Sequence, residues 1–241
     1  MIPIGDRNPT RGVVIINYLL LIANVLVFVY ELSLGEPRLD RFINAWGLRS
    51  IEVVELLRGN TDLLAPMLLK SLASMFLHGG WLHLLFNMLF LWIFGDNVED
   101  NFGSLPYLAF YLLSGLGAAL AQSLLTPRSP VPAIGASGAI SGVLAAYLLL
   151  YPRAAIRAIL PIPILFLFSF FVPAWLMIIV WFGGQLLSGY ASLTDAAQMT
   201  GGVAYGAHVG GFVVGLILTF FFRRSERSPR YEYYQERYYR R

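Results

Sequence analysis

Cysteine is absent from the 241 residues of this chain, and charged residues are scarce. The missing cysteines exclude disulfides, thiolate catalysis and cysteine-based metal sites. Only 13% of the residues are charged, 57% are hydrophobic, and the mean hydropathy is +0.65. This composition excludes a soluble globular domain and predicts a polytopic membrane protein.

Metal ligands and nucleic-acid-binding surfaces are also poorly represented. There are only three histidines, no His-Glu-x-x-His motif and no carboxylate close to a histidine pair, so we expect neither a metal nor another cofactor. An isoelectric point near 9.2 is compatible with nucleic acid as a partner. The basic excess, however, follows the last hydrophobic segment, where a charged anchor on the cytoplasmic surface explains it better.

Hydrophobic residues gather in six segments, and the first is too long for a signal-peptide core and has no small-residue cleavage site after it. We therefore expect an all-α polytopic membrane protein with six transmembrane helices and the lipid bilayer as its surroundings. Residues 1–222 would form the membrane domain, and residues 223–241 a disordered basic tail rich in Tyr and Arg. The six segments are residues 12–32, 81–98, 105–125, 137–151, about 172–187, and 202–222.

The distribution of Lys and Arg predicts cytoplasmic termini. Six spans place both termini on one side of the membrane, and eleven of the 17 basic residues fall on that side. On the opposite side, the loop 33–73 mixes charges with apolar residues at roughly helical spacing, which predicts short interfacial helices that brace the domain. The proline-interrupted stretch 160–171 should lie at the cytoplasmic edge, and residues 188–200 resemble a mobile loop.

The fourth segment contains the chain's candidate nucleophile, Ser137. As a helix, residues 137–151 span only about 21 Å at ~1.5 Å per residue, against ~30 Å of hydrocarbon. The preceding residues, 126–135, carry three prolines, and irregular backbone at membrane depth persists only inside protein or beside water. Ser137 is therefore predicted at the floor of a water-filled pit. Taken alone, Ser137 fits a helix N-cap better than a nucleophile, and the catalytic interpretation depends on the residues that accompany it.

Three of the predicted spans run in the same direction and bring polar side chains to one depth. These are His83 and Asn87 from the second span, Ser137 from the fourth and His208 from the sixth. His208 within about 3 Å of the Ser137 hydroxyl would act as its base, in a dyad without a carboxylate. Glycine pairs allow such a close approach of helices, and two of them are present: Gly138 with Gly142, and Gly211 with Gly215.

His83 and Asn87 are four residues apart and share one helix face. Their N–H groups, with the free amides at the start of the fourth helix, would stabilise an oxyanion. The competing interpretation is polar packing between helices, which is compatible with that role. His78, beside Gly79 and Gly80, fits a hydrogen bond that braces the loop better than it fits catalysis.

The chain resembles the rhomboid family of intramembrane serine proteases across all six spans. The resemblance implies a rhomboid-like fold with a short central fourth helix, a bacterial cell membrane location, transmembrane protein substrates, Ser137 and His208 as the dyad, and His83 and Asn87 as oxyanion donors. The motifs that carry it are Asn44–Leu48, His78–Asn87, Gly95 with Glu99 and Gly103, Gly135–Gly138, and Ala207–Gly211 with Gly215.

Two positions depart from the family pattern. Leu69-Lys70 replaces a common Trp-Arg, which concerns how the first loop is anchored. Ser141 replaces an aromatic residue common four positions after the nucleophile, which would pack on the base. His208 would then need another partner to orient it.

The resemblance places the substrate entrance between the second and fifth spans. We therefore expect Phe86 and Trp181 to contact each other across a closed gate, although simple core packing would explain them as well. The leading function is a serine endopeptidase that cuts transmembrane segments. The alternatives are a rhomboid-like protein that binds membrane clients without cutting them, and a transporter, which the absence of an inverted repeat disfavours.

Overall fold

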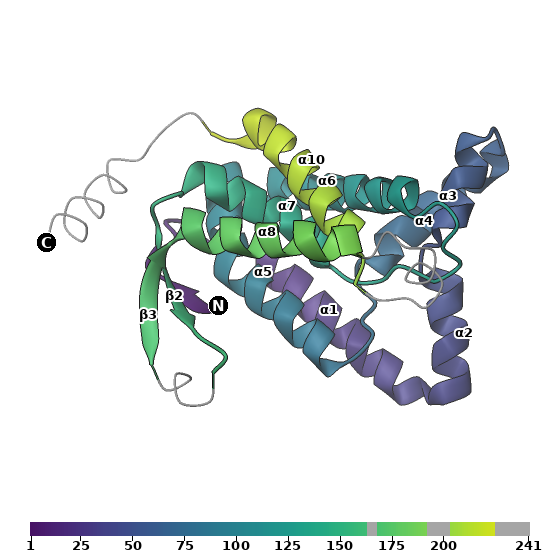
Figure 1. The fold of residues 1–241 in the computed structure, drawn as a ribbon, viewed down its shortest axis with the longest axis horizontal. Helices are drawn as coiled ribbons and strands as arrows, with labels where there is room; N and C mark the ends of the chain where they lie inside the picture. Colours follow the sequence, from purple (N-terminus) through teal and green to yellow (C-terminus); the bar gives the residue numbers. More distant parts are fainter. Residues whose placement is uncertain (163–167, 192–202, 225–241) are drawn as a thin grey trace, which may run out of the picture.

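The computed structural model describes residues 1–162, 168–191 and 203–224. Helices dominate, as the composition predicts (Figure 1). Their bounds are α1 (Ile16–Leu34), α2 (Glu36–Trp46), α3 (Ser50–Leu57), the 3₁₀ turn η1 (Thr61–Leu63), α4 (Leu64–Ser74), α5 (Trp81–Phe102), α6 (Ser104–Leu125), α7 (Ser137–Leu150), α8 (Ala174–Ala191) and α10 (Tyr205–Phe222).

Four of the described helices are long and apolar enough to cross a bilayer: α1, α5, α6 and α10. α7, with 14 residues, and α8 are apolar but shorter. The expected short central helix is therefore present, while the count of six spans remains a prediction. The predicted loop helices in residues 33–73 form as α2, α3 and α4. The expected tail and the expected mobile loop fall almost entirely outside the described residues.

α7 forms the centre of the domain. Each of its residues from Gly138 to Tyr147 is buried, and it packs against α5, α6, α8 and α10. A helix that is apolar on every side needs such surroundings, because any face left uncovered would lose its packing partners. The position of Ser137 is thus set by the most enclosed helix in the described part of the chain.

Glycines set the distance between α7 and α10. A Cβ built on Gly211 would overlap the Gly138 carbonyl oxygen, and one built on Gly215 would overlap the Gly142 backbone. The α7 glycines themselves face α6: a Cβ on Gly138 would lie 2.6 Å from the Ala118 Cβ. The predicted role of the glycines in the close approach therefore comes mainly from the α10 pair, and the α7 pair also seats α6.

A small antiparallel sheet, which the sequence analysis did not anticipate, lies at the end of the domain away from α2 and α3 (Figure 1). Its order is β1 (Ile2–Asp6), β2 (Ala155–Ile159) and β3 (Ser169–Pro173). The chain is thus helical with one sheet and not wholly helical. Pro152 follows the end of α7 and stops the helix there. The apolar residues of β2, which lie before Pro161, and of β3, which ends at Pro173, then pair as strands.

Asp6, at the end of β1, is attached to the central helix. The Tyr147 hydroxyl of α7 donates a 2.5 Å hydrogen bond to its carboxylate. Burial raises the pKa of Asp6 from 3.8 to about 6, which the Tyr147 hydrogen bond only partly opposes. The folded protein therefore holds this proton over a pH range in which the unfolded chain has released it.

The first prediction concerns the glycine contact. Gly215→Val should destabilise the folded protein by about 1–3 kcal/mol, because the new side chain overlaps the α7 backbone. Thermal unfolding in detergent measures this. Gly183→Val is the matched control, since a Cβ at Gly183 meets nothing within 4 Å. Equal midpoints for the two variants would contradict the proposed contact.

The second prediction uses the raised pKa of Asp6. Stability from this group is greatest at low pH and falls as pH rises from about 4 to 6, because the folded state then binds more protons than the unfolded state. Asp6→Asn keeps an acceptor for Tyr147 and removes the buried charge. Its unfolding midpoint should exceed that of the parent at pH 8 and match it near pH 4. The exposed Asp62→Asn serves as the control.

Candidate active site

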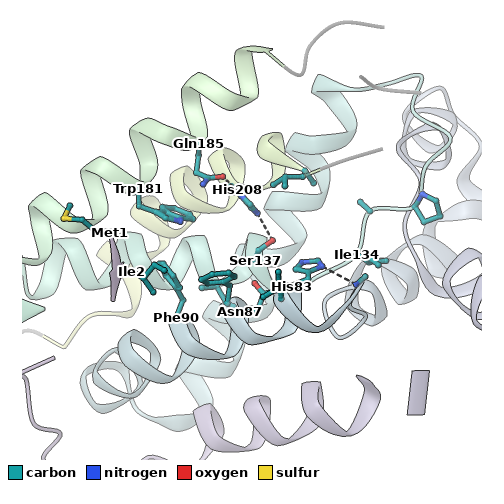
Figure 2. Close-up of a pocket in the computed structure, with 18 residues that line it drawn as sticks. Met1, Ile2, His83, Asn87, Phe90, Ile134, Ser137, Trp181, Gln185 and His208 are labelled. Carbon is teal, nitrogen blue, oxygen red and sulfur yellow. Dashed lines mark hydrogen bonds between the residues drawn. The ribbon is translucent and has the colours of Figure 1, made fainter. Parts of the chain in front are cut away.

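Ser137 and His208 lie at the starts of two adjoining helices, α7 and α10. The His208 Nε2 atom is 2.7 Å from the Ser137 hydroxyl oxygen, which is hydrogen-bond distance (Figure 2). His208 is 7% exposed, while Ser137 is only partly buried and lines a cavity of about 810 Å³. This arrangement pairs a reachable hydroxyl with a shielded base.

The segment before Ser137 is irregular, and the helices α2 to α4 hold it in place. Ala133 pairs with Leu48 through two backbone hydrogen bonds of 2.7 and 3.3 Å. The Gly135 amide donates to the Ser74 carbonyl at 2.8 Å. These bonds satisfy backbone groups that no helix or sheet would otherwise satisfy. The bracing role expected of the 33–73 loop is thus visible at the residues that lead into Ser137.

The loop helices are tied together by an ion pair at one of the two departures from the family pattern. Lys70 of α4 lies 2.5 Å from the Glu52 carboxylate of α3. Both side chains are between a fifth and a quarter exposed, so the pair is partly shielded from water. Lysine at this position therefore joins two of the bracing helices.

His83 and Asn87 reach the same cavity from α5, opposite His208 (Figure 2). The Gly79 amide donates to His83 Nδ1 at 3.3 Å, which leaves the proton on Nε2. That atom is directed at Gly135, where a built Cβ would lie only 2.6 Å away and where φ is +118°. Gly135 is therefore needed both for its backbone conformation and for the space in front of His83.

The Asn87 amide nitrogen is buried and has no hydrogen-bond acceptor within the described residues. Buried donors are normally satisfied, so this one is available for an acceptor that arrives from outside the protein. The amides of the first turn of α7 are also without helical partners, and no side chain caps them. Two side-chain donors and a helix N-terminus thus face one cavity that Ser137 lines.

His78 takes the bracing role predicted for it. Its backbone amide donates to the buried Glu31 carboxylate of α1 at 3.2 Å, and its Nδ1 lies 3.2 Å from the Phe76 carbonyl. Burial, helped by the neighbouring His83, lowers the pKa of His78 to about 4. His78 is therefore neutral near pH 7 and has a structural role. It takes no part in the hydrogen bond between His208 and Ser137.

The predicted pair Phe86 and Trp181 is not among the ring contacts of the described residues, and the gate remains a prediction. Within the described residues, Trp181 of α8 makes a ring contact with Phe90 of α5, and the two ring centroids are 6.1 Å apart. Phe86 is 42% exposed, although it and Trp181 both line the cavity. Phe86 and Phe90 are four apart on one helix face, and the sequence does not give the depth of α8 along that face.

Sequence reasoning missed Gln185 of α8. Its side-chain oxygen lies 2.5 Å from His208 Nδ1, on the opposite side of the ring from Ser137. Trp181, one turn earlier, lies over the same imidazole at 6.0 Å, and Tyr205 meets its edge at 6.2 Å. α8 thus supplies the aromatic partner that Ser141 cannot. A signal was present, because Gln185 is an uncharged polar residue in an otherwise apolar helix.

Within the described residues, no group of three or more His, Cys, Asp or Glu side chains could hold a metal ion. A hydroxyl with a base on one side and donors on the other is the arrangement used for acyl transfer.

The chain is similar to several known proteins. It is 30% identical over 198 residues to the chloroplastic Rhomboid-like protein 11 of Arabidopsis thaliana, a match that covers 81% of this chain and 64% of that protein. It is 27% identical over 235 residues to the Rhomboid protease AarA of Providencia stuartii, covering 90% and 76%. A shorter match to the Rhomboid protease GluP of Bacillus subtilis is 43% identical and covers 33% and 15%.

The chain thus spans less than two thirds of the length of the plant relative and a small part of GluP. The family model described as the Rhomboid domain matches residues 65–225, which is more than half of the chain and includes Ser137, His208, His83 and Asn87. The chain therefore belongs to the rhomboid family of polytopic helical membrane proteins.

Proposed function

We propose that this chain is an intramembrane serine endopeptidase that cleaves the transmembrane segments of other proteins, with Ser137 as nucleophile and His208 as its base. The observation that carries the proposal is the 2.7 Å distance between His208 Nε2 and the Ser137 hydroxyl, at the wall of a cavity. Similarity to two proteins named as rhomboid proteases supports it.

The reaction follows from this geometry. His208 Nε2 takes the Ser137 proton as the hydroxyl oxygen attacks the scissile carbonyl carbon. The protonated imidazole then gives that proton to the leaving amine, and an acyl ester remains on Ser137. Water entering the cavity is deprotonated by the same nitrogen and attacks the ester, which releases the acid and restores the hydroxyl.

The oxyanion formed in both steps would be stabilised by the donors opposite the base. Asn87 is the strongest candidate, because its buried amide nitrogen has no other acceptor within the described residues. The Nε2 proton of His83 and the first-turn amides of α7 would add to it. Such donors are already in place before charge develops, so they reduce the activation barrier without reorganisation.

A transmembrane substrate would enter between α5 and α8. The cavity is bordered there by Phe86, Phe90 and Trp181, so we propose the boundary between these helices as the gate. Met1 and Ile2 line the same cavity, so β1 lies beside this route. We further propose that the termini are cytoplasmic. Some relatives are named as chloroplastic or mitochondrial. A bacterial cell membrane as the location of this chain therefore remains an expectation.

The alternative is a family member that binds membrane clients without cutting them. Its usual mark would be loss of the serine or the histidine, and both are present within hydrogen-bond distance. A serine-directed fluorophosphonate separates the two functions. An enzyme should become covalently labelled at Ser137, whereas a client-binding protein should not.

The third prediction tests the dyad. Ser137→Ala should abolish labelling and cleavage of a single-span reporter protein, and His208→Ala should reduce both to background, because each removes one half of the proton transfer. Added chelators should change neither. Retained thermal unfolding would show that the variants fold. Cleavage by purified Ser137→Ala at the parent rate would disprove the assignment.

The fourth prediction tests the donors. Asn87→Ala should slow cleavage about 100-fold, since one oxyanion donor is worth ~3 kcal/mol in the transition state. His83→Ala should also slow it, and both variants should still bind a fluorophosphonate at Ser137. Asn44→Ala, an exposed site on α2, is the control. Rates within twofold of the parent in both variants would leave the pair a purely structural role.

A further inference from the structure

We propose that Gln185 is a positioning residue for the base, and that it makes His208 competent only while α8 is packed against α10. The inference rests on the proposed dyad and goes beyond it. It starts from the two partners of one imidazole: Ser137 at 2.7 Å from Nε2, and the Gln185 side-chain oxygen at 2.5 Å from Nδ1.

The two contacts divide the roles of the ring nitrogens. An amide oxygen can only accept a hydrogen bond, so the neutral imidazole must carry its proton on Nδ1. The lone pair of Nε2 then faces the Ser137 hydroxyl, which is the arrangement that proton abstraction needs. Without this acceptor, the ring would exchange between two tautomers, and the one with the proton on Nε2 cannot serve as base.

No carboxylate takes this position from the neighbouring helices. α6, α7, α8 and α10 contain neither Asp nor Glu. The titratable groups that approach the His208 ring within the described residues are His83 from α5 and Tyr205 from α10. Gln185 is therefore the acceptor that the described structure offers to Nδ1.

The same helix forms one side of the proposed gate. Trp181 lies four residues before Gln185, on the same face of α8, and contacts both His208 and Phe90 (Figure 2). A movement of α8 away from α5 and α10 would remove the Trp181 ring and the Gln185 oxygen from the base together. Admission of a substrate and activation of Ser137 would then follow one another instead of coinciding.

Two glycines directly before Gln185 make this part of α8 locally adaptable. A Cβ built on Gly183 or Gly184 would meet nothing within 4 Å, so packing does not require glycine at either position. This differs from the crowded glycines of α10. Glycine inside a helix is less stable than alanine because it loses more backbone entropy on folding, so the pair weakens α8 beside its contact with the base.

The experiment compares two replacements of nearly equal size. Gln185→Met keeps the shape and removes the acceptor, whereas Gln185→Glu keeps an acceptor and adds a charge. The second-order rate constant for labelling Ser137 with a small alkyl fluorophosphonate measures activation of the nucleophile directly. It is recorded on the full chain in detergent from pH 5 to 9. Leu186→Met, on an exposed part of α8, is the matched control.

Gln185→Met should label at least about tenfold more slowly at pH 7, the typical effect of a lost hydrogen bond of this kind. Gln185→Glu should remain reactive, and the acid limb of its pH profile should move to higher pH. The carboxylate stabilises the protonated imidazole, so a higher pH is needed to free Nε2. Leu186→Met should match the parent throughout.

An unchanged rate and pH profile in Gln185→Met would overturn the proposal. So would a folded Gln185→Glu that fails to label at any pH, because the glutamine would then act as a donor or through its shape. If Gln185→Met does not fold, the shift in Gln185→Glu still decides. A parent protein that never labels would instead overturn the proposed function.

Discussion

The close approach of α7 and α10 is the constraint on which the site depends. The hydrogen bond between Ser137 and His208 joins two helices at their first turns, and it forms only if their backbones come into direct contact. Gly211 and Gly215 permit that contact, since any side chain there would meet α7 backbone atoms. In lipid, where apolar faces gain little by association, such van der Waals contact is a principal source of helix packing.

The rest of the architecture supplies what that contact cannot. The helices α2 to α4 and the Leu48–Ala133 bridge hold the irregular segment that presents Ser137, and Gly135 leaves room for the His83 ring. α5 brings His83 and Asn87 to the side of the cavity opposite His208, and α8 contributes Trp181 and Gln185. α8 thus contacts His208 and also borders the proposed entrance.

Much of this site could be predicted from the sequence because polar groups are rare in the spans. Ser137, His208, His83 and Asn87 are conspicuous in apolar surroundings, and span direction alone placed them at one depth. The depth of α8 along α5 could not be predicted, since α8 contains no charged side chain that would fix its position relative to the membrane surface. For that reason Phe86 was chosen where Phe90 is the contact. Gln185 carries no charge and so does not stand out in the sequence as an ionisable group would. The sheet could not be predicted because β1 pairs with β2 across 150 or more positions of the sequence.

The unsatisfied amide of Asn87 lowers the stability of the folded protein. A buried donor without an acceptor costs the resting fold about 1–3 kcal/mol. An apolar residue of similar size at this position would relieve that cost. The same replacement would remove the group best placed to meet a negative oxygen. If Asn87 has the proposed role, selection for heat resistance alone would favour a more stable and less active protein, and stability and function oppose each other at this residue.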